Sequence, residues 1–217
     1  MQSQLTVIGC GVFGRAIVDG LSSESHEHQS YSLSLTHRRK EAAEKLRNDY
    51  PEALVTNDNT DTQIWMSPKH QGNRHIVVIG TQPQYTAEAC DDITQAFTSA
   101  GGTQQLVVVT VCPGITISQL ESWLPPNTPI VRTMPNTPIA VRQGATALFA
   151  NGSTTSGVAS EIQSIFRRMS PAVALLPRED LMDIVASVSG YVTRDSVFFF
   201  LRIVHFLLSL FSSYTIS

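Results

Sequence analysis

Three glycines near the amino terminus are the residues whose spacing most clearly suggests a chemical use. Gly9, Gly11 and Gly14 form a G-x-G-x-x-G pattern, with Val12 and Phe13 between the last two. Between a strand and a helix, the first glycine permits a sharp turn, the second leaves room for a pyrophosphate, and the third lets the helix pack closely. The N–H groups at the helix start then face the phosphates. The pattern predicts a dinucleotide-binding turn, and a glycine turn without a ligand is the alternative.

The residues after the next predicted strand indicate which dinucleotide binds. A unit for NAD usually carries an acidic residue about 20 residues past the glycines, which accepts a hydrogen bond from the ribose 2′-hydroxyl. Here that place holds Thr36, His37, Arg38, Arg39 and Lys40. A hydroxyl and two guanidinium groups would bind a 2′-phosphate, whereas a carboxylate would repel it. The sequence therefore predicts NADP(H); alternatively, Arg38, Arg39 and Lys40 are only the solvated start of a helix.

Two buried strands are predicted further along the chain, and the residues after them are of interest. Residues 75–80 and 106–111 are continuous, mostly β-branched apolar runs, as expected of strands buried on both faces. Ligands of open α/β sheets bind outside the carboxyl ends of the strands. We therefore expect the tetrapeptide Thr81, Gln82, Pro83, Gln84 to line a cofactor cleft.

A framework of alternating strands and helices positions these segments. Apolar patterning predicts strands at 5–8, 31–36, 54–56, 75–80, 106–111, 130–138, 144–150 and 172–176, and helices at 12–21, 41–50, 85–100, 158–169 and from 179 onward. The alternation indicates an α/β fold, with a Rossmann-like, doubly wound, mostly parallel sheet. We place an NADP-binding domain at 1–177. Residues 178–217 are predicted to start a helical domain, a truncated remnant that diverges after Gly190 into an apolar tail.

Composition argues against several classes of function. The 217 residues carry a formal net charge of −3, so no basic field is available for nucleic acid. Cys10, Cys90 and Cys112 are isolated in the sequence, which predicts reduced thiols and no metal site. The amino terminus shows no basic segment followed by an apolar one, so we expect no secretory signal and a cytoplasmic location.

The order of the motifs resembles that of the pyrroline-5-carboxylate reductases. The resemblance covers about residues 4–190 and rests on the glycine turn, TQPQ, CPGIT, VRTMPNTP with Gly144 shortly after, and EDLMDIVASVSG. The segment 134–138 behind Arg132 is its most specific part. The resemblance implies an oxidoreductase of amino-acid biosynthesis that reduces the cyclic imine pyrroline-5-carboxylate to proline, the last step of proline biosynthesis, with NAD(P)H.

The resemblance also implies roles for individual residues. Thr36 and Arg38 would meet the 2′-phosphate, and Asn59, or Asn57 if the register slips, would contact the adenosine ribose. Met134, Pro135 and Asn136 would border the nicotinamide and the substrate, Glu179 would lie near the domain junction, and no acid or base is implied. The residues implied for cofactor binding are Gly9, Gly11, Val12, Phe13, Gly14, Thr36, Arg38, Asn59, Thr81, Gln82, Pro83, Cys112 and Gly114.

The sequence departs from the family pattern in the cleft and after Gly190. Gln82 stands where the family usually has a lysine, and Pro113 where it has an alanine. After Gly190 the family continues into a helical domain that makes the dimer and supplies the loop for the substrate carboxylate. Without that continuation, we expect impaired or absent turnover of pyrroline-5-carboxylate. Full-length members of the family are homo-oligomers, and the same assembly is doubtful for this chain.

Three interpretations of residues 191–217 are open. The apolar run 197–211 is fifteen residues long and contains Arg202 and His205, so it is shorter than the roughly 17–25 residues that span a membrane. It is apolar nearly all round, which argues against an amphipathic surface helix. We favour foreign sequence, as a retained intron or a frameshift would produce.

Two other functions compete with the reductase. A related NADP-dependent dehydrogenase acting on a hydroxy acid would normally need a lysine or histidine near the nicotinamide. TQPQ, CPGIT and MPNTP offer neither. The other candidate is a non-catalytic NADP-binding fragment.

Overall fold

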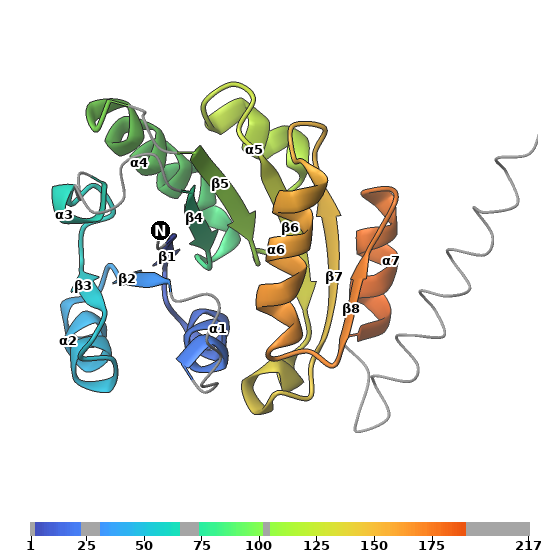
Figure 1. Cartoon of the computed structure of the whole chain (residues 1–217), viewed down its shortest axis with the longest axis horizontal. Coiled ribbons are helices and arrows are strands. Elements are labelled where there is room, and N and C mark those ends of the chain that lie inside the picture. Colours follow the sequence, from blue (N-terminus) through green and yellow to red (C-terminus); the bar gives the residue numbers. More distant parts are fainter. Residues whose placement is uncertain (1–2, 23–30, 66–73, 102–104, 190–217) are drawn as a thin grey trace, which may run out of the picture.

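Eight strands of the described residues form one sheet in the order β3-β2-β1-β4-β5-β6-β7-β8 (Figure 1). The computed structural model describes residues 3–22, 31–65, 74–101 and 105–189. The strands are β1 (Gln4–Ile8), β2 (Ser32–Thr36), β3 (Leu54–Thr56), β4 (Arg74–Ile79), β5 (Gln105–Thr110), β6 (Ile130–Pro135), β7 (Ala145–Ala150) and β8 (Ala172–Leu175).

Helices cover both faces of this sheet (Figure 1). They are α1 (Val12–Ser22), α2 (Lys40–Asp49), α3 (Thr62–Trp65), α4 (Thr86–Ser99), α5 (Ile117–Trp123), α6 (Ser156–Arg167) and α7 (Asp180–Ser189). Apolar side chains of α1, α2 and α6 share one buried core, and those of α3, α4 and α5 share another. The α7 helix packs on the second face, because Phe149 contacts both its cluster and the α3–α4–α5 core. The predicted doubly wound sheet is confirmed.

The first six strands are parallel, and the last two run against them. The sheet pairs β1 with both β2 and β4, so the strand order reverses direction beside β1. In sheets of this order the ligand binds at that switch point, outside the carboxyl ends of the strands. β7 pairs antiparallel with β6 and parallel with β8. Parallel pairing needs a long crossover, and only a short 3-10 helix, Thr137–Val141, connects β6 to β7.

The helix α5 and the end of strand β6 differ from the sequence prediction. The helix α5 was not predicted, although Thr116 and Gln119 form a capping box at its start. A threonine followed three residues later by glutamine is a recognisable start signal. The segment 130–138 was predicted as a strand that runs into Pro135 and Pro138, which cannot continue it. The strand ends at the first of these prolines, and the next residues turn into the 3-10 helix.

Part of the chain lies outside the described residues. The apolar tail predicted at 191–217 falls there, as does most of the segment proposed as a helical domain. The boundary placed at 177 stays a prediction. None of the helices in the described ranges is long and apolar enough to cross a membrane.

A buried arginine joins three elements near the carboxyl end of the described chain. The Arg132 side chain on β6 is 5% exposed and donates to Glu179 Oε1 at 3.0 Å and to Asp183 Oδ1 at 2.9 Å. Glu179 Oε1 also accepts the backbone N–H of Ile117, the first residue of α5, at 2.8 Å. Glu179 therefore holds the start of α7 against both the sheet and α5.

We expect Glu179→Ala to lower the free energy of unfolding by about 3 kcal/mol, because it leaves the buried Arg132 charge without its inner partner. Asp183→Ala is the matched control. The Asp183 side chain is 73% exposed, so its loss should cost less than about 1 kcal/mol. Urea unfolding of both variants measures the difference. Equal losses of unfolding free energy in the two variants would show that the burial of the Arg132–Glu179 pair does not determine its contribution to stability.

Candidate functional site

The glycine turn lies at the switch point of the sheet. Gly9 has a φ of 73°, a left-handed conformation that disfavours side chains, and a Cβ there would lie only 2.9 Å from Thr81 Cγ2. Both the backbone conformation and the lack of space therefore require glycine. The N–H of Cys10 donates to the Thr36 carbonyl at 2.9 Å. The N–H of Gly80 donates to the Ile8 carbonyl at 2.8 Å. These bonds hold the turn between the ends of β2 and β4.

The other two glycines meet opposite surroundings. A Cβ on Gly14 would lie 2.8 Å from Val7 Cγ1 and 3.2 Å from Cys10 Sγ, so α1 packs on β1 only because this residue has none. A Cβ on Gly11 would have the Gly9 carbonyl at 3.9 Å as its nearest neighbour. Gly11 faces open space at the start of α1, where a pyrophosphate fits and a side chain would occupy its place. The turn thus suits the predicted dinucleotide.

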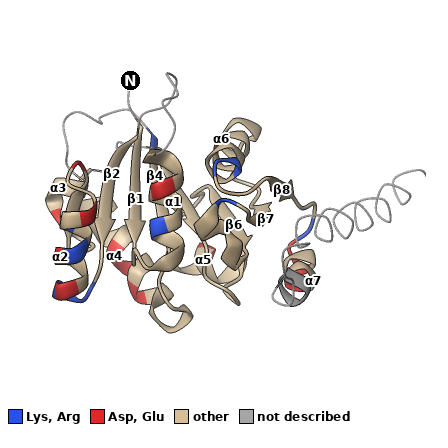
Figure 2. Ribbon diagram, turned by 90° about the horizontal axis from the view of Figure 1, so that it is seen from below, with Lys and Arg blue, Asp and Glu red and all other residues tan. Residues whose placement is uncertain are grey.

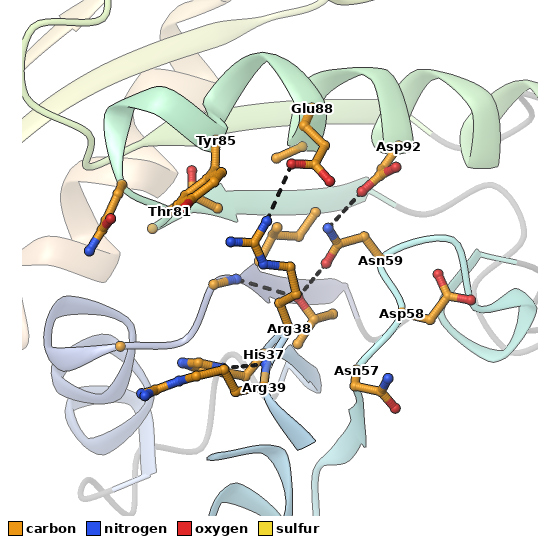
Figure 3. A pocket seen from close by; sticks show the side chains of 17 residues that line it. His37, Arg38, Arg39, Asn57, Asp58, Asn59, Thr81, Tyr85, Glu88 and Asp92 are labelled. Carbon is orange, nitrogen blue, oxygen red and sulfur yellow. Dashed lines mark hydrogen bonds and ion pairs between the residues drawn. The ribbon is translucent and has the colours of Figure 1, made fainter. Parts of the chain in front are cut away.

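A cleft of about 810 Å³ opens beside this turn (Figure 3). It runs from the glycines across the ends of β1, β2 and β4 to the side of α4. The residues predicted for the cofactor that line it are Gly9, Gly11, Thr36, Arg38, Asn59, Thr81 and Gln82, together with Asn57, the alternative to Asn59. Segments far apart in the sequence therefore meet at one cleft, as the carboxyl ends of parallel strands require.

Basic residues form the rim at the start of α2. Arg38 lies with its guanidinium carbon 4.0 Å from the centre of the Tyr85 ring, and its Nη1 is 3.5 Å from Glu88 Oε2 (Figure 3). Burial, followed by the nearby Arg39, lowers the pKa of His37. The neutral ring fits its observed role, because His37 Nδ1 accepts the Arg39 N–H at 3.2 Å. The α2 helix begins without a side-chain cap at Arg39, so its first N–H groups add to a positive rim.

Acidic residues line the opposite side of the same cleft. The α4 helix carries Glu88, Asp91 and Asp92 and no lysine or arginine (Figure 2). Glu88 and Asp92 line the cleft, and their spacing of four places them on one face of the helix. Tyr85 and Asp58 also line it. These four residues were not predicted from the sequence, although the polar face of a helix directly after TQPQ was a usable signal.

The remaining predicted cofactor residues lie around the cleft. Val12 is 72% exposed at the start of α1, and Phe13 packs partly against the core. Pro83 begins the 3-10 helix Pro83–Tyr85, and Cys112 is buried, with its Sγ donating to the Thr81 carbonyl at 3.1 Å. Gly114 has a φ of 74° in a turn with open space around it. Their cofactor contacts stay predictions.

The predicted substrate-side residues end strand β6. Asn136 is buried, and its Oδ1 accepts the Ala145 N–H at 2.8 Å, while its own N–H donates to the Ala145 carbonyl at 3.1 Å. This side chain holds β6 to β7. Met134 packs partly against the α7 cluster and Pro135 is buried. None of the three is among the residues of the described cleft, and their roles toward nicotinamide and substrate stay predictions.

We expect Gly11→Val to remove NADPH binding and to leave the domain folded. The valine would fill the open space kept for the pyrophosphate, and nothing in the core stands in its way. Fluorescence titration with NADPH and thermal unfolding measure the two effects. As a contrast, Gly14→Val should unfold the domain, because its Cβ would overlap Val7. A Gly11→Val protein that still binds NADPH would contradict the assignment of the turn.

Comparison with known proteins gives the same family as the motifs. A Delta-1-pyrroline-5-carboxylate reductase of Gibberella fujikuroi is 43% identical over 189 residues, which cover 85% of this chain and 63% of that protein. A pyrroline-5-carboxylate reductase of Mycobacterium leprae is 30% identical over 201 residues, 93% of this chain and 63% of that protein. The chain therefore spans less than two thirds of the length of these relatives. No family model matches it.

Solved structures of similar fold include members of the same family. A pyrroline-5-carboxylate reductase from Coxiella burnetii has a TM-score of 0.72 and 27% identity, over 88% of this chain and 64% of that one. A Plasmodium falciparum pyrroline carboxylate reductase, solved with NADP bound, shares the fold with a TM-score of 0.64 and 18% identity, over 95% of this chain and 78% of that one. The resemblance predicted from the motifs is confirmed: this chain is a homologue of the amino-terminal part of the pyrroline-5-carboxylate reductases.

Proposed function

We propose that this chain is the NADP(H)-binding part of an oxidoreductase that reduces pyrroline-5-carboxylate to proline. The observation that carries the proposal is one cleft with the glycine turn at one end and the cationic rim of Arg38 and Arg39 at the other. This spacing suits a dinucleotide with a 2′-phosphate. The NADP-bound relative from Plasmodium supports the choice of cofactor.

Each end of the cleft has a proposed task. Gly9 and Gly11, with the first N–H groups of α1, would hold the pyrophosphate. Arg38 and Arg39 would pair with the 2′-phosphate, and for Arg38 this means exchanging the 3.5 Å contact to Glu88 for the phosphate. Thr81 and Gln82, at the end of β4, would direct the cofactor toward the sheet edge where β5 and β6 end.

The proposed chemistry rests on positioning. When bound, NADPH supplies a hydride, which the carbon of the cyclic C=N bond accepts. The nitrogen carries its proton already in the iminium form or takes it from water. Holding the two reacting carbons at about 3–3.5 Å can provide roughly 7–11 kcal/mol of the barrier. The chain therefore needs residues that orient the substrate, for which we propose Met134, Pro135 and Asn136 as one wall.

The cysteines support a reducing compartment, and we propose the cytoplasm. Cys10, Cys90 and Cys112 are free and buried. Burial raises the pKa of Cys10 and of Cys90 to about 12, so these thiols are protonated and inert.

The proposed partners are a small molecule and further copies of the chain. Pyrroline-5-carboxylate is the proposed small-molecule partner. A net charge of −3 does not suit nucleic acid, and assembly as a homo-oligomer, as in the full-length family, is part of the proposal.

We expect wild type to bind NADPH more tightly than NADH, and Arg38→Ala to reduce that preference about tenfold or more. A charge-assisted hydrogen bond contributes about 1.5–3 kcal/mol, and only NADPH offers the phosphate that uses it. Arg167→Ala is the control, because it removes an equal charge from the exposed end of α6. Titrations with both nucleotides at one ionic strength give the ratio. Equal dissociation constants in wild type would refute the choice of NADP(H).

A second test concerns the reaction. We expect residues 1–189 joined to the remaining third of the Gibberella relative to form proline from pyrroline-5-carboxylate and NADPH. The 217-residue chain alone should do so far more slowly, because the family resemblance places the substrate-carboxylate anchor in the helical part. Proline formation and NADPH oxidation are measured together. A fusion that binds NADPH and makes no proline would favour a non-catalytic nucleotide-binding role.

A further inference from the structure

A line of hydrogen bonds crosses the floor of the cleft from the glycine turn to α4. The N–H of Gly9 donates to Thr36 Oγ1 at 3.4 Å, and Thr36 Oγ1 donates to Asn59 Oδ1 at 2.6 Å. Asn59 Nδ2 then donates to Asp92 Oδ2 at 2.8 Å (Figure 3). The line joins the turn after β1 to β2, to the segment after β3 and to α4.

The carboxylate at the end of the line sets its direction. A carboxylate only accepts hydrogen bonds, so Asn59 must turn its NH₂ group toward Asp92. The amide oxygen then faces Thr36, whose hydroxyl proton is used in that bond. Trp65 holds the backbone of the same residue, since its indole N–H donates to the backbone carbonyl of Asn59 at 2.8 Å. Without Asp92, an Asn59 amide turned by 180° would fit a reoriented Thr36 hydroxyl equally well.

This direction determines what the cleft offers a ligand. The Thr36 hydroxyl uses its proton in the hydrogen bond to Asn59, so any further hydrogen bond that it makes on the floor of the cleft is one that it accepts. Asn59 keeps a second amide N–H, which can donate. A neighbouring acceptor and donor match a sugar hydroxyl, which both donates and accepts. In this arrangement Thr36 has no proton left for a 2′-phosphate, unlike the role that the family resemblance implies for it, so the phosphate-specific contacts belong to Arg38 and Arg39 on the basic rim.

We propose that Asp92 is a positioning residue for cofactor binding, which acts through Asn59 to present this donor–acceptor pair to the adenosine ribose. The proposal rests on the proposed function, because it assumes that a dinucleotide occupies the cleft. It assigns ribose recognition to the line from Thr36 to Asp92. Since both nucleotides carry the 3′-hydroxyl of that ribose, and only NADPH carries the 2′-phosphate, a line that binds the 3′-hydroxyl should strengthen NADPH and NADH binding alike.

The test compares two substitutions that remove the same charge from the full chain. Asp92→Asn keeps a side-chain oxygen that accepts from Asn59 Nδ2 in one orientation of its amide, although it no longer imposes that direction, whereas Asp92→Leu offers no acceptor. We expect Asp92→Leu to bind both nucleotides about tenfold more weakly than Asp92→Asn, as the loss of a positioned hydrogen bond predicts. The NADPH-to-NADH ratio should be the same in these two variants. Rescue by asparagine separates positioning from a charge effect, and thermal unfolding confirms that each variant is folded.

A second comparison uses Asn59→Ala as background. There, Asp92→Leu and Asp92→Asn should bind each nucleotide within twofold of one another, because the residue through which Asp92 acts is gone. A tenfold difference that persists in this background would overturn the proposal, and so would equal affinities of the two variants with Asn59 present. Asp92→Ala replaces Asp92→Leu in both comparisons if the leucine variant unfolds.

These outcomes are distinct from failure of the proposed function. If wild type binds neither nucleotide, the proposed function fails and the inference fails with it. If wild type binds NADPH and Asp92→Leu matches Asp92→Asn, the proposed function stands and only the role of Asp92 is refuted. A change in the NADPH-to-NADH ratio between the two variants would place Asp92 with the phosphate contacts and would refute its assignment to the ribose.

Discussion

The approach of α1 to β1 is the constraint on which the rest of the site depends. Gly14 leaves no room for a methyl group between the helix and Val7, while Gly9 turns the chain through a left-handed conformation beside Thr81. Both conditions place the start of α1, with its unpaired N–H groups, directly above the end of β1. Backbone bonds from Cys10 to Thr36 and from Gly80 to Ile8 tie this turn to the ends of β2 and β4, where other residues of the cleft follow.

The cleft combines opposite charges over a short distance. Cations at the start of α2 face carboxylates on α4, and Arg38 meets Glu88 across it. Exposed pairs of this kind contribute little to stability, so the arrangement is better understood through binding. A cationic rim favours a phosphate, while the acidic side orders an amide and a hydroxyl. In the proposed complex the two sides would therefore contact different parts of one nucleotide.

Local sequence signals predicted most of the framework and failed where the signal was short or nonlocal. The buried strands β4 and β5 and the amphipathic α4 and α6 follow from apolar patterning alone. The seven-residue α5 was missed because its periodicity is brief, although its Thr116 capping box was present. The apolar pattern of β7 does not show that this strand runs antiparallel to β6. The antiparallel direction follows from the short connection after Pro135, which cannot cross the sheet.

For the site, the sequence by itself determined the residue types at the strand ends. The glycine turn and the basic residues after β2 follow from spacing, because strand order and parallel pairing bring those ends to one edge. Only the tertiary structure decided which polar groups meet. Thr36, Asn59 and Asp92 are separated by 23 and 33 residues in the chain, so no local pattern links them. They form one line because the ends of β2 and β3 and a face of α4 converge there, and hydrogen-bond direction depends on that convergence.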